Sequence, residues 1–156
     1  WKIIHKNFTG NSNMENKKFN QVSFISVKNA DIDSILKLYR DAGWWKEEYD
    51  PKEIPRLIES SFIFIIGLSK ETQEIIAMGR VISDGFYGII QDLCVLKKYR
   101  GKGIGKLLID FMIDSAKNAG LFRIILVAEP GTEFLYQKSG FISDRNQIFL
   151  LHTYQE

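Results

Sequence analysis

The sequence predicts a mixed α/β fold in which a largely antiparallel sheet contains one parallel pair of strands. Apolar runs typical of strands are interspersed with stretches of helical periodicity. Asp84-Gly85, between two strand-like runs, favours a β-hairpin and therefore antiparallel neighbours. Residues 89–128 predict a strand, a helix and a strand, and a unit of this kind joins two parallel strands through a crossover helix.

Length and composition indicate one globular domain with a sizeable core. The chain has 156 residues, of which 45% are hydrophobic and 26% charged. A net charge of +2 is too small to favour nucleic acid as a partner. The apolar runs are much shorter than the roughly 20 residues that cross a membrane, and Cys94 is the only cysteine. We therefore expect a cytoplasmic protein with no membrane or nucleic-acid partner and no intrachain disulfide.

The first residues differ in character from the rest. Residues 7–13 are polar and rich in turn formers, and Met14 is a candidate for the natural start. We expect residues 1–20 to form an N-terminal extension, with 1–13 as its candidate non-native part. Residues 21–156 are then expected to form the domain.

The domain is expected to begin with a strand and two helices. Residues 22–27 are rich in β-branched and aromatic side chains, which favours a strand. Asn29 or Asp31 can cap a helix whose apolar positions have helical spacing and which ends at Gly43. After a loop, a second helix is expected over 51–60, with an interruption or restart at Pro55.

The remaining elements follow from apolar runs and from glycine or proline boundaries. Strands are expected at 62–68, 74–83 and 86–96, followed by a helix over 103–119 that ends at Gly120. Residues 122–128 predict a buried strand, and Pro130 opens a short helix that ends near Gly140. Residues 141–142 and 147–152 are expected to complete the chain as strands.

The most informative stretch lies between the strand at 86–96 and the helix at 103–119. We call it the glycine loop: Arg100-Gly101-Lys102-Gly103-Ile104-Gly105-Lys106. Its three glycines permit a tight turn and leave the first amides of the helix uncovered. Its three basic side chains add positive charge beside a helix N-terminus, which already favours anions. The loop therefore predicts an anion site, most plausibly for phosphate oxygens.

The glycine loop does not match the two common nucleotide loops. A Walker A loop would need glycine in place of Arg100 and serine or threonine in place of Leu107. A dinucleotide fingerprint would need glycine in place of Lys106 or Leu108. The simplest alternative is a glycine turn whose basic residues face water and bind nothing.

Three segments together match the pattern of one known family. The glycine loop fits the family's motif, which consists of arginine or glutamine, any two residues, glycine, any one residue, and then glycine or alanine. The strand at 90–95 and the segment 134–141, in which an aromatic residue and a tyrosine precede Gly-Phe, stand at the family's spacing. On these motifs the chain resembles the GNAT superfamily of N-acetyltransferases over residues 22–152. The resemblance implies the GNAT fold, with a central parallel pair of strands that splay apart.

The resemblance implies acetyl-CoA as the donor. In the family, amides of the glycine loop bind the pyrophosphate, which implies a binding role for residues 100–106. The backbone of Leu93, Cys94 and Val95 would pair with the pantetheine arm, and one of these amides would polarise the thioester carbonyl. The acceptor implied is a primary amine, expected to be a small molecule.

The resemblance also suggests how the two protons are handled. Tyr136 matches the family tyrosine that protonates the departing thiolate and is the candidate acid, with a packing tyrosine on a short helix as the alternative. Asp92 is the only carboxylate in the key strand and is the candidate base. Strand alternation complicates this assignment, because Gln91 would share the side of Leu93 and Val95 while Asp92 pointed away. Asp84 and a chain of waters are the alternatives.

Several residues bear on the acceptor and on competing chemistry. Trp44, Trp45 and Tyr49 lie where the family's variable acceptor wall forms, so they and Gln91 are candidate substrate contacts, with simple packing as the alternative. Residues 77–85 and 90–92 also resemble small-amine acetyltransferases, including arylalkylamine types. Glu129 stands where many members have an asparagine that contacts pantetheine, which puts that contact in doubt.

Other functions have weaker support. Cys94 has no nearby base in the sequence, so a small buried strand residue is expected rather than an acyl-cysteine. The sequence contains neither a nucleophile elbow nor a metal-spaced cluster of histidine and cysteine, so we expect no metal. A non-catalytic acyl-CoA sensor and a nucleotide-phosphate binder remain as alternatives. The family resemblance is compatible with a monomer or a homodimer.

Overall fold

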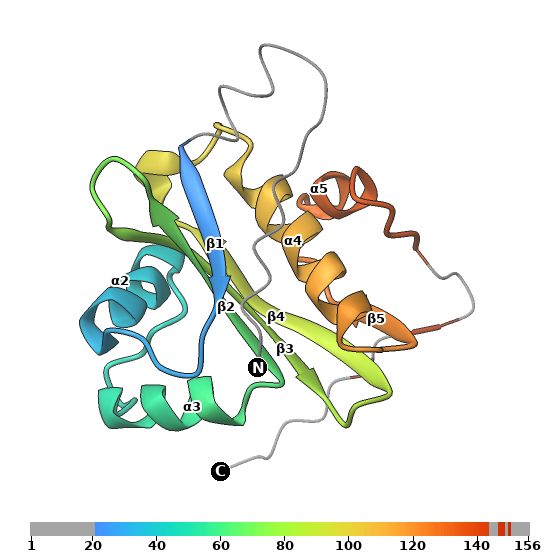
Figure 1. Ribbon diagram of the computed structural model, residues 1–156, viewed down its shortest axis with the longest axis horizontal. Coiled ribbons are helices and arrows are strands. Elements are labelled where there is room, and N and C mark those ends of the chain that lie inside the picture. The colour runs from blue at the N-terminus through green and yellow to red at the C-terminus, as the bar shows by residue number, and fades with distance from the viewer. Residues whose placement is uncertain (1–20, 144–146, 149, 151–156) are drawn as a thin grey trace.

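A computed structural model shows a five-stranded sheet with helices on both of its faces (Figure 1). The structure describes residues 21–143, 147–148 and 150. Its elements in chain order are β1 (Val22–Ser26), α2 (Ile32–Ala42), the 3₁₀ helix η1 (Pro51–Glu53), α3 (Ile54–Ser60), β2 (Ile63–Ser69), β3 (Ile75–Ser83), β4 (Tyr87–Val95), the 3₁₀ helix η2 (Lys97–Tyr99), α4 (Ile104–Asn118), β5 (Arg123–Leu126) and α5 (Glu133–Gln137).

The strands lie side by side in chain order, β1-β2-β3-β4-β5. Neighbours from β1 to β4 are antiparallel, whereas β4 and β5 are parallel. Helix α4 joins this parallel pair as a crossover, because parallel strands cannot be linked by a tight turn. The predicted mixed sheet with one parallel pair is confirmed.

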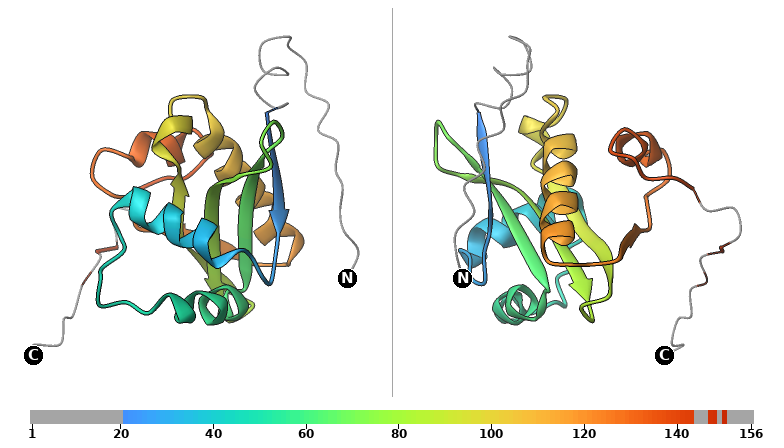
Figure 2. Two further views of the ribbon diagram at one scale, coloured as in Figure 1. Left: turned by 90° about the vertical axis from the view of Figure 1, so that its left-hand side faces the viewer. Right: turned by 45° about the vertical axis from the view of Figure 1, so that its right-hand side comes forward.

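The core consists of two layers of apolar side chains, one on each face of the sheet. Helices α2 and α3 cover one face and α4 covers the other (Figures 1 and 2). The apolar stripe of each helix points inward, and the fully buried residues include Ile35 and Leu38 of α2, Ile58 of α3 and Met112 of α4. Full burial of such a side chain contributes about 1.5–3 kcal/mol. The helical spacing in the sequence therefore fixes which helix faces meet the sheet.

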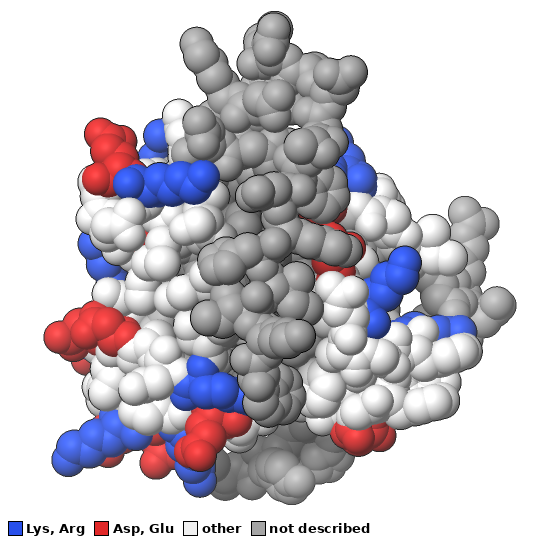
Figure 3. Space-filling model, in the orientation of Figure 1, with Lys and Arg blue, Asp and Glu red and all other residues white. Residues whose placement is uncertain are grey.

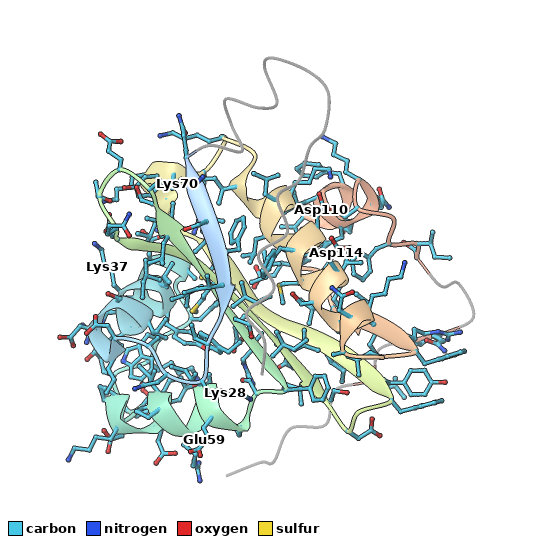
Figure 4. All side chains as sticks on the ribbon, viewed as in Figure 1. Lys28, Lys37, Glu59, Lys70, Asp110 and Asp114 are labelled. Atoms are coloured by element: carbon cyan, nitrogen blue, oxygen red, sulfur yellow. The ribbon has the colours of Figure 1, made fainter. Side chains whose placement is uncertain are left out.

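Side-chain bonds and one glycine define the ends of α2 and the end of α3. The Ser34 amide donates to Asp31 Oδ2 at 2.8 Å, so Asp31 rather than Asn29 is the N-cap. Gly43 ends α2 with φ of 80°, a conformation that glycine adopts at little cost. Lys28 Nζ donates to the Ser61 carbonyl at 2.6 Å and lies near Glu59 at the end of α3 (Figure 4).

The proline-containing segment forms two connected helices. The 3₁₀ helix η1 covers its first three residues, and α3 continues directly from it. Pro55 lies in the first turn of α3, where its missing N–H costs no helical hydrogen bond. The expected helix over 51–60 with a restart at Pro55 is confirmed.

The predicted hairpin joins β3 to β4. Asp84 Oδ1 accepts from the Phe86 amide at 2.9 Å, and this bond holds the turn closed. Gly85 has φ of 96°, which a residue with a Cβ rarely adopts. The turn residues therefore account for the antiparallel pairing of the two strands.

The prediction of a buried strand over 122–128 is wrong in its burial. Strand β5 is shorter than expected, and neighbouring apolar side chains are exposed, at 67% for Phe122, 46% for Ile125 and 63% for Val127. A continuous apolar run cannot by itself distinguish a strand covered on both faces from one covered on a single face.

Only part of the two predicted terminal strands lies among the described residues. Residues 141–142 are not in a strand, and the same holds for 147, 148 and 150, so the prediction is wrong at these positions. The remainder of 147–152 and the predicted extension over 1–20 lie outside the described residues.

Surface charge and helix length add two further observations. On the face shown in Figure 3, Lys and Arg side chains lie among Asp and Glu side chains rather than apart from them. Pairs such as Arg56–Glu53, with 2.6 Å between Nη2 and Oε2, contribute to this mixture. Within the described ranges, no helix has the length and apolar character needed to cross a membrane.

Gly88 provides a test of packing between β3, β5 and the end of α4. A Cβ at this position would lie 2.7 Å from Leu121 Cδ1 and 2.9 Å from Val81 Cγ1, and the valine is stiff about χ1. We expect Gly88→Ala to lower the free energy of unfolding by about 1–3 kcal/mol in urea titrations. Gly105→Ala is the control, because its Cβ would make ordinary contacts within α4 and should leave stability equal or raise it by up to about 1 kcal/mol. Equal stability of the two variants would contradict the prediction.

Candidate active site

Among the described strands, none pairs with the second half of β4 on the side away from β3. Pairing with β5 ends at Ile90 and Leu126, whereas β4 continues to Val95. We call residues 91–95 the open edge of β4. Unpaired backbone groups at such an edge can bind an extended ligand as an added strand.

Two hydrogen bonds show which backbone groups face the open side. The Leu96 amide donates to the Ile76 carbonyl at 2.9 Å, so Leu96 faces β3. The Val95 carbonyl instead accepts from Arg100 Nε at 2.7 Å, on the side away from β3. Because backbone groups alternate along a strand, the N–H groups of Val95 and Leu93 both face the open side.

A β-bulge interrupts β4 at its centre. Met78 pairs with Cys94 and Arg80 with Gln91, so two residues of β4 stand against one residue of β3. Asp92, one of these two, has φ of 52°, an uncommon value for a residue other than glycine. Positions of this kind cluster at ligand-binding sites because they re-aim side chains.

The bulge changes the alternation of side chains. Asp92 Oδ2 accepts from Tyr39 Oη at 2.8 Å, and Cys94 Sγ lies 4.0 Å from the Leu38 carbonyl, so both side chains face α2. A Cβ at Gly105, the second residue of α4, would lie 4.0 Å from Val95 Cγ2, so Val95 faces the other layer. Asp92 therefore points away from Val95.

Gln91 lies with Asp92 and not with Leu93 and Val95. Gln91 Oε1 accepts from Arg80 Nη2 at 3.0 Å, and Arg80 Nε also donates to Asp92 Oδ2. The expectation that Gln91 shares the side of Leu93 and Val95 is wrong, because the extra residue in the bulge reverses the alternation between them.

Asp92 is held by two donors that both bind its Oδ2 atom. Arg80 has a side-chain exposure of only 15%, and its charge is balanced by Asp92. Burial and the neighbouring Asp92 charge raise the pKa of Tyr39, so Tyr39 stays protonated and donates. Oδ1 of Asp92 accepts no hydrogen bond from any residue that the structure describes. It is the oxygen through which Asp92 could take a proton.

Aromatic side chains form a wall beside Asp92, on the face covered by α2. The Tyr39 ring centroid lies 6.5 Å from that of Trp44 and 6.2 Å from that of Trp45, and Trp45 lies 5.6 Å from Tyr49. The two tryptophans are half-buried and Tyr49 is 46% exposed. We call these four residues the aromatic wall. They pack on one another and also present apolar surface to a ligand.

Glu129 connects the aromatic wall with the segment that carries Tyr136. Trp44 Nε1 donates to Glu129 Oε1 at 3.3 Å. Tyr136 is half-buried, and its ring lies 6.1 Å from that of Phe141. Burial and the charge of Glu129 raise the pKa of Tyr136, so its hydroxyl remains protonated at neutral pH. This is the state required of a proton donor.

The glycine loop leads directly into α4. Gly101 and Gly103 have φ of 74° and 82°, which allows the chain to turn sharply between η2 and the helix. Gly103 caps α4 without a side chain, and the Leu107 amide donates to the Gly103 carbonyl at 3.2 Å to close the first turn. The amides of residues 104–106 consequently have no partner within the helix and are available to an anion.

Carboxylates balance much of the charge that the sequence places in the glycine loop. Arg100 Nη2 lies 3.2 Å from Asp41 Oδ2, and Lys106 Nζ lies 2.6 Å from Asp110 Oδ2. Lys102 Nζ sits 5.3 Å from the Tyr99 ring centroid and has no carboxylate partner in the described part of the chain. Helix amides and Lys102 are therefore the groups best placed to meet an anion.

Two further sets of hydrogen bonds, one at Glu74 and one at Asp110, lie next to the glycine loop. Glu74 accepts from Lys98 Nζ at 2.8 Å and from Tyr99 Oη at 3.2 Å, and its other oxygen accepts from Lys37 at 2.7 Å. Ser139 Oγ donates to Asp110 Oδ1 at 2.7 Å, and this bond joins α4 to the residues just after α5. Figure 4 labels Asp110 on α4.

The structure bears on two alternatives, an acyl-cysteine at Cys94 and a base at Asp84. Burial raises the pKa of Cys94 to about 12, so its thiol stays protonated and unreactive, as expected for a small buried strand residue. Asp84 lies at the hairpin, at the opposite end of β4 from Leu93 and Val95, and its carboxylate binds backbone amides. Across the described residues, His, Cys, Asp and Glu side chains form no group that could hold a metal ion.

Only weak signals in the sequence point to the residues that organise the site. Tyr39 belongs to the apolar stripe of α2, and a buried tyrosine hydroxyl usually has a hydrogen-bond partner. Arg80 is a charged residue inside an otherwise apolar strand, so a nearby carboxylate was to be expected. Asp41 and Asp110 carry no comparable signal, because acidic residues are common on exposed helix surfaces.

Comparisons with known sequences agree with this geometry. A family model described as the acetyltransferase (GNAT) family matches residues 31–141. A Pyropia yezoensis protein named uncharacterized N-acetyltransferase ycf52 is 28% identical over 132 residues, which cover 84% of this chain and 76% of the relative. An Arabidopsis thaliana glucosamine 6-phosphate N-acetyltransferase is 31% identical over 64 residues, 41% of this chain and 43% of the relative.

Comparisons with solved structures agree in fold. An acetyltransferase of the GNAT family from Streptococcus pneumoniae superposes with a TM-score of 0.69 at 21% identity, covering 86% of this chain and 99% of that chain. The structure of the Arabidopsis thaliana glucosamine-6-phosphate N-acetyltransferase gives 0.67 at 19% identity, covering 88% and 100%. At identities this low, the similarity shows a shared fold and nothing finer.

The ion pairs of Glu74 predict a specific dependence of stability on pH. Its bonds to Lys37 and Lys98 lower its pKa from 4.5 to about 2. A folded-state pKa below the unfolded value contributes stability at higher pH, and this contribution is lost as pH falls from about 4.5 toward about 2. We expect the wild type to lose more free energy of unfolding than Glu74→Gln between about pH 6 and about pH 3.5, measured by urea titration. Glu71→Gln, an exposed neighbour, should behave like the wild type; identical pH dependence in all three would contradict the prediction.

Proposed function

This chain belongs to the acetyltransferase (GNAT) family, and on that premise we propose that it transfers an acetyl group from acetyl-CoA directly to a primary amine of a small molecule. The observation that carries the proposal is the juxtaposition of two groups of unpaired backbone amides. One lies along the open edge of β4, and the other lies at the N-terminus of α4 immediately after it. An acyl-CoA is an extended chain that ends in phosphates, and the two groups of amides match these two parts.

The proposed donor site uses the glycine loop for the pyrophosphate. The uncovered amides of residues 104–106 and the helix dipole attract the phosphate oxygens, and Lys102 adds a full charge. Leu93 and Val95 offer their N–H groups to the pantetheine arm. Either amide could also donate to the thioester oxygen as negative charge develops there, an interaction worth about 3–4 kcal/mol in comparable oxyanion holes.

The proposed acceptor site lies on the face covered by α2. An alkylammonium group must lose a proton before it attacks, which costs about 4–5 kcal/mol at neutral pH. Asp92 Oδ1 is the group proposed to take this proton, directly or through water, while Tyr39 and Arg80 fix the orientation of the carboxylate through Oδ2. The neutral amine then forms the new C–N bond at the thioester carbon.

Collapse of the tetrahedral intermediate breaks the C–S bond and leaves the CoA thiolate. Tyr136 is proposed to donate its proton to this sulfur, and the raised pKa of Tyr136 supports this role because the hydroxyl is protonated at neutral pH. The nitrogen loses two protons over the cycle, one before attack and one from the tetrahedral intermediate; one of them replaces the proton that Tyr136 gives to the thiolate, and the other is released to water. The products are the N-acetylated amine and CoA.

Two acceptor classes have support. The aromatic wall favours an amine attached to an aromatic or apolar body. Several relatives are named glucosamine 6-phosphate N-acetyltransferases, which makes an amino sugar phosphate the second candidate. A thiol-release screen over aromatic amines, polyamines, amino acids, peptide N-termini and glucosamine 6-phosphate would separate them. A cytoplasmic location, and an oligomeric state of monomer or homodimer, stay predictions.

Acetyl-CoA should stabilise the protein against heat, because a ligand that binds only the folded state raises its stability. We expect a rise of several degrees in Tm at about 100 Kd of acetyl-CoA. Lys102→Glu should reduce the affinity about tenfold, since a negative charge replaces a positive charge that has no carboxylate partner among the described residues. Lys52→Glu, on η1, makes the same change in net charge away from the loop and should bind like the wild type. A wild type without any shift in Tm would contradict the donor site.

Tyr136→Phe tests the proposed proton donor. We expect kcat to fall about a hundredfold with little change in the affinity for acetyl-CoA, because the phenyl ring still packs against Phe141 while the hydroxyl is lost. Steady-state thiol release and calorimetric binding provide the two measurements. Unchanged turnover would leave Tyr136 as a packing residue. CoA binding by the wild type without turnover on any amine would instead favour a non-catalytic acyl-CoA sensor.

A further inference from the structure

We propose that Asp41, in the last turn of α2, is a positioning residue that holds the segment before the glycine loop and so sets the affinity for acetyl-CoA. The inference rests on the proposed donor site and assigns a role to a residue on a different element. Asp41 lies 56 and 59 positions before the two residues that it binds, so the link is purely tertiary.

One carboxylate oxygen of Asp41 binds both ends of the segment 97–100. Oδ2 accepts from the Lys97 amide at 2.9 Å and from Arg100 Nη2 at 3.2 Å. The same guanidinium donates through Nε to the Val95 carbonyl at 2.7 Å. Asp41, Arg100 and the last residue of β4 therefore form one connected set of hydrogen bonds across the turn.

The position of Asp41 in α2 indicates that its charge serves the loop rather than the helix. Negative charge in the last turn of a helix is opposed by the helix dipole. Here the carboxylate is partly buried, at 25% exposure, and its charge is offset by Arg100 and by an amide outside α2. A charge that is unfavourable for its own helix is thus balanced entirely by contacts with the segment before the glycine loop.

The contact also fixes what the glycine loop presents to a ligand. With its guanidinium bound to Asp41 and Val95, Arg100 is directed toward the end of β4. The amides of residues 104–106 and Lys102 then remain for the pyrophosphate. If segment 97–100 is held in one conformation before the ligand arrives, binding does not have to order it, and affinity rises accordingly.

The test compares Asp41→Asn with the wild type in calorimetric CoA binding and in steady-state kinetics. Asparagine keeps the shape and one carbonyl acceptor for the Lys97 amide but loses the charge that binds Arg100. We expect CoA binding and the KM for acetyl-CoA to weaken about five- to tenfold, while kcat and the KM for the amine stay within about twofold. The Tm without ligand should change little, because loss of the bond to Arg100 offsets the relief of the unfavourable charge on α2.

Two further variants sharpen the result. Asp33→Asn, in the first turn of the same helix, removes one charge away from the loop and should bind CoA like the wild type. Arg100→Lys keeps the positive charge but cannot reach Asp41 and Val95 together, so it should weaken CoA binding to a similar extent. In the double variant Asp41→Asn with Arg100→Lys, the two losses should be less than multiplicative, because both variants break the same contact.

The outcomes separate this inference from the proposed function. Wild-type affinity for CoA in Asp41→Asn would overturn the positioning role while leaving the donor site intact. Equal weakening in Asp33→Asn, or multiplicative losses in the double variant, would also overturn it. A wild type that binds no CoA would overturn the donor site itself.

Discussion

The structure depends on one constraint: along the second half of β4, no strand of the described part of the chain pairs with the side away from β3. Pairing with β5 stops at Ile90, and the bulge at Asp92 then shifts the register against β3. Buried or partly buried amides without partners are unfavourable, so such an edge persists only where a ligand or water binds it. The uncovered first turn of α4 begins only nine residues after Val95, at Ile104. Both sets of free amides thus belong to one region, and the helices on either face keep that region in place.

Helix α2 connects the two halves of the proposed site within four residues of its last turn. Leu38 contacts Cys94 on the strand, Tyr39 binds Asp92, and Asp41 binds the segment before the glycine loop. A helical turn is rigid because each residue is tied by backbone hydrogen bonds to its neighbours. The proposed donor and acceptor sites are therefore positioned by the same turn, and a shift of α2 would move Asp92 and the loop together.

Periodicity and turn chemistry predicted most of the fold, because both depend on neighbours in the sequence. The elements from β1 to α4 lie within a few residues of their expected bounds, and Asp84-Gly85 gave the hairpin. The bulge could not be predicted, since one extra residue leaves the apolar pattern of β4 nearly unchanged while reversing the side chains beyond it. The partners of the basic loop residues were also hidden, because Asp41 is brought to Arg100 only by tertiary packing.

The balance of charge around the glycine loop bears on how an anion would be bound. Arg100 and Lys106 each face a carboxylate, so their net attraction for a diphosphate at a distance is small. The α4 amides carry no such compensation, and their partial charges are fixed in direction by the helix. In the proposed donor site, selectivity then comes from the geometry of these amides rather than from the number of basic side chains. In the proposed donor site, Arg100 acts chiefly by holding the segment before the loop through Asp41, Lys106 pairs with Asp110 within α4, and Lys102 adds charge.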